Sequence, residues 1–145
     1  MTALTHSRPR SIERLPLVGR LPLERLPLER LPRVTARLEG VFVFAAALAL
    51  YVHLGYGWIP LAVLALAPDL SMLGYLGGDR TGALSYNAVH TYVGPLLLAG
   101  IGVLGGIDLA VQIALIWSAH IGADRALGYG LKYPTGFKQT HLQRL

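Results

Sequence analysis

The sequence predicts an all-α protein, a four-helix transmembrane bundle that follows a disordered or extended N-terminal arm. Hydrophobic residues make up 53% of the 145 residues and charged residues 14%, whereas roughly 25% of residues are charged in soluble domains. The apolar residues also form long blocks rather than short alternating runs. Such blocks are typical of helices solvated by lipid. We divide the chain into an arm, 1–35, and a helical domain, 36–145.

The arm is a low-complexity segment in which the unit Arg-Leu-Pro recurs about every five residues. Proline at this spacing prevents a continuous helix because it lacks an N–H and clashes with the preceding turn. Residues 1–37 hold a net charge of +5, which leaves residues 38–145 neutral. The arm has no aromatic residue to stack on bases, which argues against a nucleic-acid partner. Its arginines suit anionic lipid instead, and the alternative is that the arm is dispensable.

Four apolar segments give the four predicted helices. They cover about residues 38–54, 58–76, 86–104 and 107–129. The first segment is near the lower limit of about 17 residues for a span. The polar loop 77–85 separates the second helix from the third, and two glycines separate the third from the fourth. Five glycines at the third helix and its end, 94, 100, 102, 105 and 106, are expected to let helices approach closely.

The topology follows from the distribution of cations. With four spans, all thirteen Lys and Arg residues lie on one side of the membrane. The positive-inside rule makes that side cytoplasmic, so we expect a multi-pass cell-membrane protein, partnered by the lipid bilayer, with both termini in the cytoplasm. A three-span alternative, with the first segment lying in the interface, would split the positive charge. Cysteine is absent, which excludes disulfides and thiolate metal ligands and fits a bacterial type of membrane protein.

Ionisable side chains inside the predicted spans fall at similar depths. At about 1.5 Å per residue and a core of about 30 Å, Asp69 lies about 16 Å below the outer surface. On the same scale the depths of His120, His90 and Asp124 are about 20, 24 and 26 Å. Ionisable groups are costly in lipid and need a partner or a function. We therefore expect a polar cluster in the cytoplasmic half of the bundle.

The helical faces agree with this convergence. His120 and Asp124 are four residues apart and share a face, and Asn87 and His90 form a second polar stripe. Pro68, just before the aspartate of the second helix, frees a carbonyl and can kink that helix. The candidate polar cluster is Asp69, Asn87, His90, His120, Asp124 and Arg125.

Three interpretations of this cluster remain open. In the first, Asp69, His90, His120 and Asp124 bind a divalent metal, such as zinc, manganese or iron. The chain is then a metal-dependent membrane hydrolase for a lipid or phosphate ester, with Arg125 or Lys132 holding an anionic head group. In the second, the cluster handles ions or protons, which would require a homo-oligomer because four short helices enclose only a narrow path. In the third, Asp–His pairs only hold the helices together. No motif for an organic cofactor is present.

Three segments also resemble a known family. They are APDLSMLGYLGG (67–78), YNAVHTYVGP (86–95) and IWSAHIGADRALGYGLKYPTGFKQTHLQRL (116–145). Together they resemble the small bacterial multi-spanning membrane proteins of domain of unknown function 4260, over roughly residues 36–145. The resemblance implies the membrane fold but no reaction. It places the family's polar motifs on Asp69, Asn87, His90, His120, Asp124, Arg125, Lys132 and His141.

Overall fold

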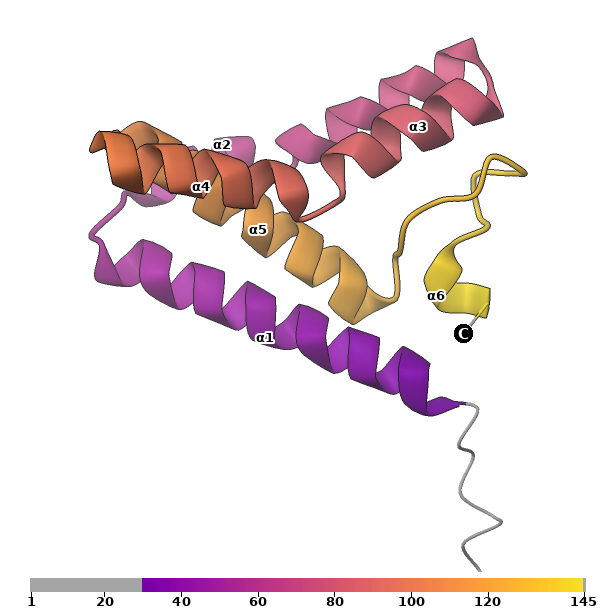
Figure 1. Ribbon diagram of the computed structural model, residues 1–145, viewed down its shortest axis with the longest axis horizontal. Coiled ribbons are helices and arrows are strands. Elements are labelled where there is room, and N and C mark those ends of the chain that lie inside the picture. The colour runs from indigo at the N-terminus through magenta and orange to yellow at the C-terminus, as the bar shows by residue number, and fades with distance from the viewer. Residues whose placement is uncertain (1–29, 145) are drawn as a thin grey trace, which may run out of the picture.

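The computed structural model describes residues 30–144 and confirms the all-α fold class (Figure 1). In chain order the helices are α1 (Leu31–His53), α2 (Trp58–Leu64), the 3₁₀ helix η3 (Ala67–Gly77), α3 (Asp79–Val89), α4 (Val93–Gly105), α5 (Asp108–Leu127) and α6 (His141–Arg144). Within the described range the only β-type pairing is an isolated bridge between Lys132 and Thr140. Residues 1–29, most of the predicted arm, lie outside the described residues.

The helices run back and forth along the bundle in four lengths that alternate in direction (Figure 1). These lengths, which we call passes of the bundle, are α1, α2 with η3, α3 with α4, and α5. The helix α5 packs against α1 and α4, while η3 packs against α3. At one end of the bundle the Tyr56 hydroxyl donates to the Asp108 carbonyl over 3.3 Å. Near the other end, the Arg33 guanidinium of α1 donates to the Gln143 carbonyl of the tail over 3.0 Å. At both ends of the bundle, hydrogen bonds thus join segments that are far apart in the sequence.

The packing of α1 against α5 depends on two facing glycines. A Cβ on Gly122 would lie 2.7 Å from the Phe44 nitrogen and 2.9 Å from the Gly40 oxygen. A Cβ on Gly40 would in turn lie 2.8 Å from the Gly122 oxygen. The two backbones are therefore in direct contact, as in membrane helix pairs that use small residues at the interface. The cross-helix bond expected of a polar residue is also present, since Gln112 donates to the Tyr51 hydroxyl over 3.0 Å.

The glycines of α4 divide into two groups. Gly94 faces Trp117, and Gly102 faces Val111, both on α5 and both too close for an added Cβ. These two glycines let α4 approach α5 as the sequence predicts. Gly100 has no heavy atom within 4 Å of an added Cβ, so it plays no part in this approach.

The helix boundaries differ from the predicted ones because of three prolines. The first helix begins at Leu31 rather than near residue 38, since Pro32 stands in its first turn, where the missing N–H is harmless. The second pass breaks between α2 and η3 just before Pro68. The third pass begins at Asp79, inside the predicted loop, and breaks at 90–92, just before Pro95 in the first turn of α4.

Within residues 30–144, three stretches are long and apolar enough to cross a membrane, Leu31–His53, Trp58–Gly77 and Asp79–Gly105. The last two each join a pair of the helices named above. Many large apolar side chains on α1, α2 and α4 are exposed, including Phe42, Ile59 and Leu104. Apolar patches of this extent are unusual on soluble monomers and are compatible with a lipid-facing surface. The number of passes through the membrane and the side on which the termini lie remain predictions.

Candidate metal centre

Four side chains from three passes meet where the η3–α3 hairpin joins α5. They are Asp69 of η3, His90 at the end of α3, and His120 and Asp124 of α5, and we call them the Asp/His cluster. Both side chains from α5 point the same way because they are four residues apart. The histidine side chains are 3% and 7% exposed, while those of Asp69 and Asp124 are 38% and 20% exposed. The cluster is therefore closed on its histidine side and more open on its carboxylate side.

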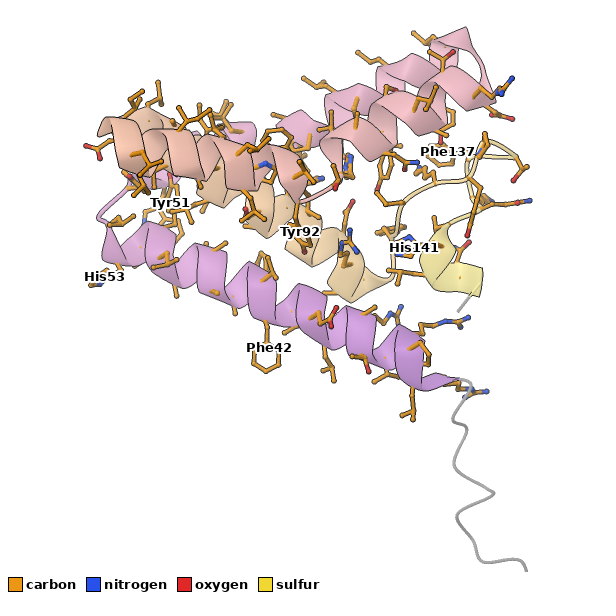
Figure 2. All side chains as sticks on the ribbon, in the orientation of Figure 1. Phe42, Tyr51, His53, Tyr92, Phe137 and His141 are labelled. Carbon is orange, nitrogen blue, oxygen red and sulfur yellow. The ribbon has the colours of Figure 1, made fainter. Side chains whose placement is uncertain are left out.

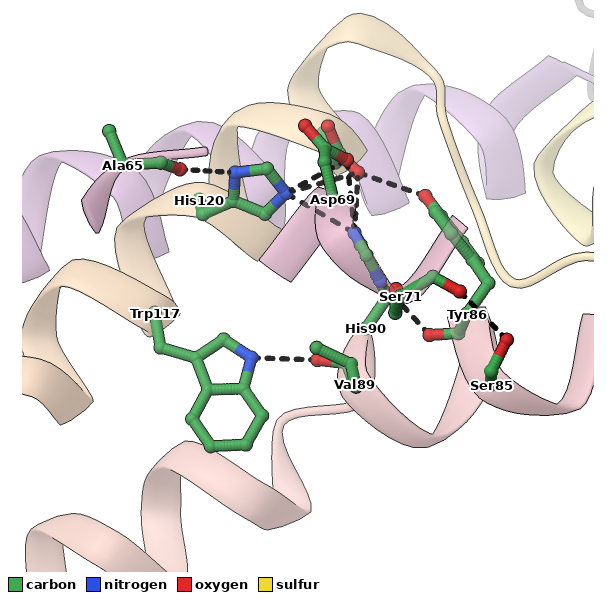
Figure 3. Close-up of polar contacts among 10 residues, drawn as sticks. Ala65, Asp69, Ser71, Ser85, Tyr86, Val89, His90, Trp117 and His120 are labelled. Atoms are coloured by element: carbon green, nitrogen blue, oxygen red, sulfur yellow. Dashed lines mark hydrogen bonds and ion pairs between the residues drawn. The ribbon is translucent and has the colours of Figure 1, made fainter. Parts of the chain in front are cut away.

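The distances within the cluster match the coordination shell of a metal ion (Figure 3). The two histidine Nε2 atoms are 3.2 Å apart. Nε2 of His90 lies 3.6 Å from both Asp69 Oδ1 and Asp124 Oδ2, and Nε2 of His120 lies 3.6 and 3.9 Å from the same oxygens. A tetrahedral zinc ion with bonds of about 2.0–2.1 Å separates its ligand atoms by roughly 3.3–3.4 Å. All four ligand atoms lie within 4.8 Å of one another.

The hydrogen bonds of the imidazole rings decide which nitrogen faces the centre. Nδ1 of His90 is 2.9 Å from the Tyr86 carbonyl, and Nδ1 of His120 is 2.7 Å from the Ala65 carbonyl (Figure 3). A carbonyl only accepts, so Nδ1 carries the hydrogen in both rings. In the neutral rings Nε2 then presents a lone pair. Two imidazole lone pairs and two carboxylates thus face one point, and a cation is the partner that satisfies all four.

The Ala65 carbonyl is free to accept because of Pro68, the proline predicted to free a carbonyl and kink the second helix. In a 3₁₀ segment the N–H of residue 68 would bond to the carbonyl of residue 65, but Pro68 has none. His120 occupies this acceptor instead. At the second break, Trp117 Nε1 of α5 donates to the Val89 carbonyl over 2.7 Å (Figure 3). Two α5 side chains therefore satisfy backbone carbonyls at both interruptions, and one of them is a member of the cluster.

Tyr86 supports the cluster in three ways, none of which the sequence revealed. Its hydroxyl donates to Asp124 Oδ2 over 2.9 Å, and its carbonyl receives the His90 Nδ1 hydrogen. Its ring stacks on the His90 ring, with centroids 3.7 Å apart and planes 11° from parallel. Such outer contacts fix the orientation of metal ligands. The available signal was the i, i+4 spacing of Tyr86 and His90, which places both on one face.

A cavity of about 550 Å³ opens beside the carboxylates of the cluster. Its lining combines acidic, basic, hydroxyl and aromatic side chains from η3, α3, α5 and the tail: Asp69, Met72, Tyr86, Asp124, Tyr129, Lys132, Phe137, Lys138, Thr140 and Gln143. A second cavity of about 250 Å³ is apolar and includes Pro68, Val89 and Trp117, each next to or near a cluster residue. The histidines do not line the larger cavity, so its contact with the cluster is through the carboxylates.

Lys132 lies in an aromatic cage at this cavity. It is 8% exposed, and its Nζ is 3.4 Å from the Phe137 ring centroid, 4.5 Å from that of Tyr86 and 5.4 Å from that of Tyr75. Burial lowers the pKa of Lys132 below its usual value, and the negative charges of Asp124 and Asp69 act in the opposite direction. The aromatic rings attract the cation but accept none of its three hydrogens in an ordinary hydrogen bond.

The other predicted residues lie outside the cluster. Asn87 donates to the Lys132 carbonyl over 2.8 Å and accepts from the Lys132 N–H over 2.7 Å, so it holds the tail against α3. Arg125 lies over the Tyr92 ring, 4.9 Å from its centroid, and does not line the larger cavity. His141 is placed on α6 in the tail (Figure 2), where its Nδ1 is 3.4 Å from the Leu131 carbonyl.

Comparison with known proteins gives a family but no activity. No curated protein and no solved structure is significantly similar to this chain. The family described as Domain of unknown function (DUF4260) matches residues 33–145, which include every helix of the bundle except the first two residues of α1. The match covers more than half of the chain and includes the whole Asp/His cluster. The chain therefore belongs to the DUF4260 family.

Proposed function

We propose that the chain is a metal-dependent membrane hydrolase whose metal ligands are the four residues of the Asp/His cluster. One observation carries the proposal: both histidines donate from Nδ1 to backbone carbonyls, so that two Nε2 lone pairs and two carboxylates converge within 4.8 Å. Without a cation, this arrangement brings only hydrogen-bond acceptors together, and like groups repel. Imidazole and carboxylate ligands suit zinc, manganese or iron.

A catalytic role is favoured over a structural one by the ligand set and by the cavity. Closed structural zinc sites are typically rich in cysteine, which this chain lacks. The carboxylates border a cavity that admits a small molecule, so a water or substrate oxygen could approach a bound ion from that side as a fifth ligand, a coordination number that zinc reaches during catalysis. A divalent ion held by the four residues of the Asp/His cluster would supply activation of water for hydrolysis.

Direct Asp–His hydrogen bonds, the basis of the purely structural alternative, do not fit the geometry. The Nε2–carboxylate distances of 3.6–3.9 Å exceed the range of about 2.7–3.2 Å for such bonds. A proton shared between the two Nε2 atoms, which are 3.2 Å apart, would provide these nitrogens with a hydrogen bond. The two carboxylates would receive no hydrogen bond from that proton. A metal ion accounts for all four groups at once.

The test is the metal content of the detergent-purified full chain, measured by inductively coupled plasma mass spectrometry. We expect about one divalent ion per chain in the wild type and almost none in His120→Ala. His53→Ala is the matched control, because His53 is an exposed histidine at the end of α1, and it should retain the metal. Equal metal content in the wild type and His120→Ala would refute the proposal.

A further inference from the structure

The cavity beside the Asp/His cluster contains a buried cation that makes no direct contact with a carboxylate of residues 30–144. The Lys132 side chain is 8% exposed, and among the described residues its ammonium contacts only the rings of Phe137, Tyr86 and Tyr75. A buried charge is costly unless it is paired and hydrogen-bonded. Cation–π contacts offset part of this cost, but the three N–H donors remain available.

A buried hydroxyl belongs to the residue that pairs with Lys132 across the isolated bridge. Thr140 is 3% exposed, and its Oγ1 is buried without a hydrogen-bond partner in the described part of the chain. The isolated antiparallel bridge pairs Thr140 directly with Lys132, and directly opposed residues in such a pair project to the same side. Both residues line the larger cavity. The larger cavity is therefore lined by a residue with a buried cation and by a residue with a buried, unpartnered hydroxyl, and the bonds from Asn87 to the Lys132 backbone hold this wall in place.

The charges around the cavity identify the kind of ligand. Its lining has two carboxylates, Asp69 and Asp124, and two ammonium groups, Lys132 and Lys138. A divalent ion on the carboxylates neutralises them and leaves a cavity with two positive charges. A dianion with several acceptor oxygens suits this cavity, and a phosphate monoester carries both properties near neutral pH. Buried lysine is also a common partner of phosphate.

We propose that Lys132 and Thr140 form a phosphate-binding subsite, and that the substrate of the hydrolase is a phosphate ester whose phosphate group lies between this subsite and the metal. This inference rests on the proposed function, since the metal completes the positive charge of the cavity. The phosphate belongs either to a soluble ester or to a lipid head group, because both carry the same group. Arg125, the other cation considered from the sequence, does not line this cavity, so it is not assigned to the subsite.

The experiment measures binding of inorganic phosphate to the metal-loaded full chain by isothermal titration calorimetry, with metal content determined on every sample. Lys132→Met is expected to weaken phosphate binding about tenfold to a hundredfold, as for a lost charge-assisted hydrogen bond. Thr140→Val, a change of similar shape, is expected to weaken it roughly threefold to tenfold. Arg80→Met removes one charge from an exposed site on α3 and is expected to leave phosphate binding unchanged.

The outcomes separate the two proposals. A wild type without metal contradicts the hydrolase, whatever its affinity for phosphate. A metal-loaded wild type that does not bind phosphate, or metal-loaded Lys132→Met and Thr140→Val variants that bind it as the wild type does, would overturn the subsite and leave the metal centre standing. Phosphate release from glycerol 3-phosphate and from dioleoyl phosphatidic acid in nanodiscs then distinguishes a soluble ester from a lipid. Release from neither, by protein that holds metal, contradicts the substrate class.

Discussion

The orientation of two imidazole rings determines what the Asp/His cluster can bind. Each ring is fixed from behind by a backbone carbonyl, so its Nε2 lone pair is directed at the carboxylates. The Tyr86 hydroxyl fixes Asp124 in the same way. The metal affinity proposed for the cluster would therefore depend on residues that do not touch the ion, as is usual for protein metal sites.

Tyr86→Phe tests this dependence. The substitution removes the hydroxyl bonded to Asp124 and keeps the ring stacked on His90. We expect metal affinity to fall roughly tenfold to a hundredfold, measured by competition with a chelator of known affinity. Tyr56→Phe, which removes a hydroxyl from the opposite end of the bundle, is the control and should bind metal as the wild type does. Unchanged affinity in Tyr86→Phe would show that the hydroxyl does not position the ligand.

The convergence of the four Asp/His cluster residues could be predicted from the sequence, whereas the residues that support them could not. Depth along a helix depends only on residue count, so the residue numbers alone place Asp69, His90 and His120 at similar levels. Helix rotation and the path of the tail depend on packing between distant segments. The contacts of Tyr86 with Asp124 and the burial of Lys132 among aromatic rings follow from that packing, and no local pattern encodes them.

Interrupted helices are the elements that build the centre. The second and third passes each break near the cluster, and α5 side chains bind the carbonyls at both breaks. Broken helices are tolerated at membrane depth when buried protein groups satisfy the freed backbone. The sequence indicated the first break through Pro68. The second break was not predicted: the expected third helix ran from 86 to 104 without interruption, although Pro95 stands just after the break.

Pro68→Ala tests whether the first break serves the metal centre. Alanine restores an N–H that can bond to the Ala65 carbonyl and compete with His120 for it. We expect a more regular helix, with slightly higher ellipticity at 222 nm, and metal affinity reduced several-fold. Pro60→Ala, in the first turns of α2, is the control for the loss of a proline. Wild-type metal affinity in Pro68→Ala would mean that the break does not orient His120.

The contact between α1 and α5 is tested by a pair of glycine substitutions. In Gly122→Ala the new Cβ would lie 2.7 Å from the Phe44 nitrogen, so the backbones must separate, at a cost of about 1–3 kcal/mol. Gly100→Ala meets no atom within 4 Å and is expected to stabilise α4 by up to about 1 kcal/mol. Unfolding of each variant in detergent with increasing sodium dodecyl sulfate measures its free energy of unfolding relative to the wild type. A Gly122→Ala protein as stable as the wild type would contradict this packing.

At the scale of the whole molecule, α5 joins the passes around one polar centre. It packs against α1 through glycines, against α4 through Trp117 and Val111, and it carries two of the four residues of the Asp/His cluster. The all-α class and the membrane-compatible length of three stretches follow from apolar blocks, which the sequence shows directly. The cavity could not be predicted, because it forms between the η3–α3 hairpin, α5 and a tail that folds back on α3.

X-ray absorption spectroscopy of the zinc-loaded full chain tests the metal centre most directly. Four protein ligands of the types proposed give nitrogen and oxygen scatterers at about 2.0–2.1 Å, together with the outer-shell scattering of two imidazole rings. His120→Ala should lose one imidazole contribution or the metal itself. Zinc that binds without imidazole scattering, or a spectrum identical in the wild type and His120→Ala, would contradict a metal centre formed by the Asp/His cluster.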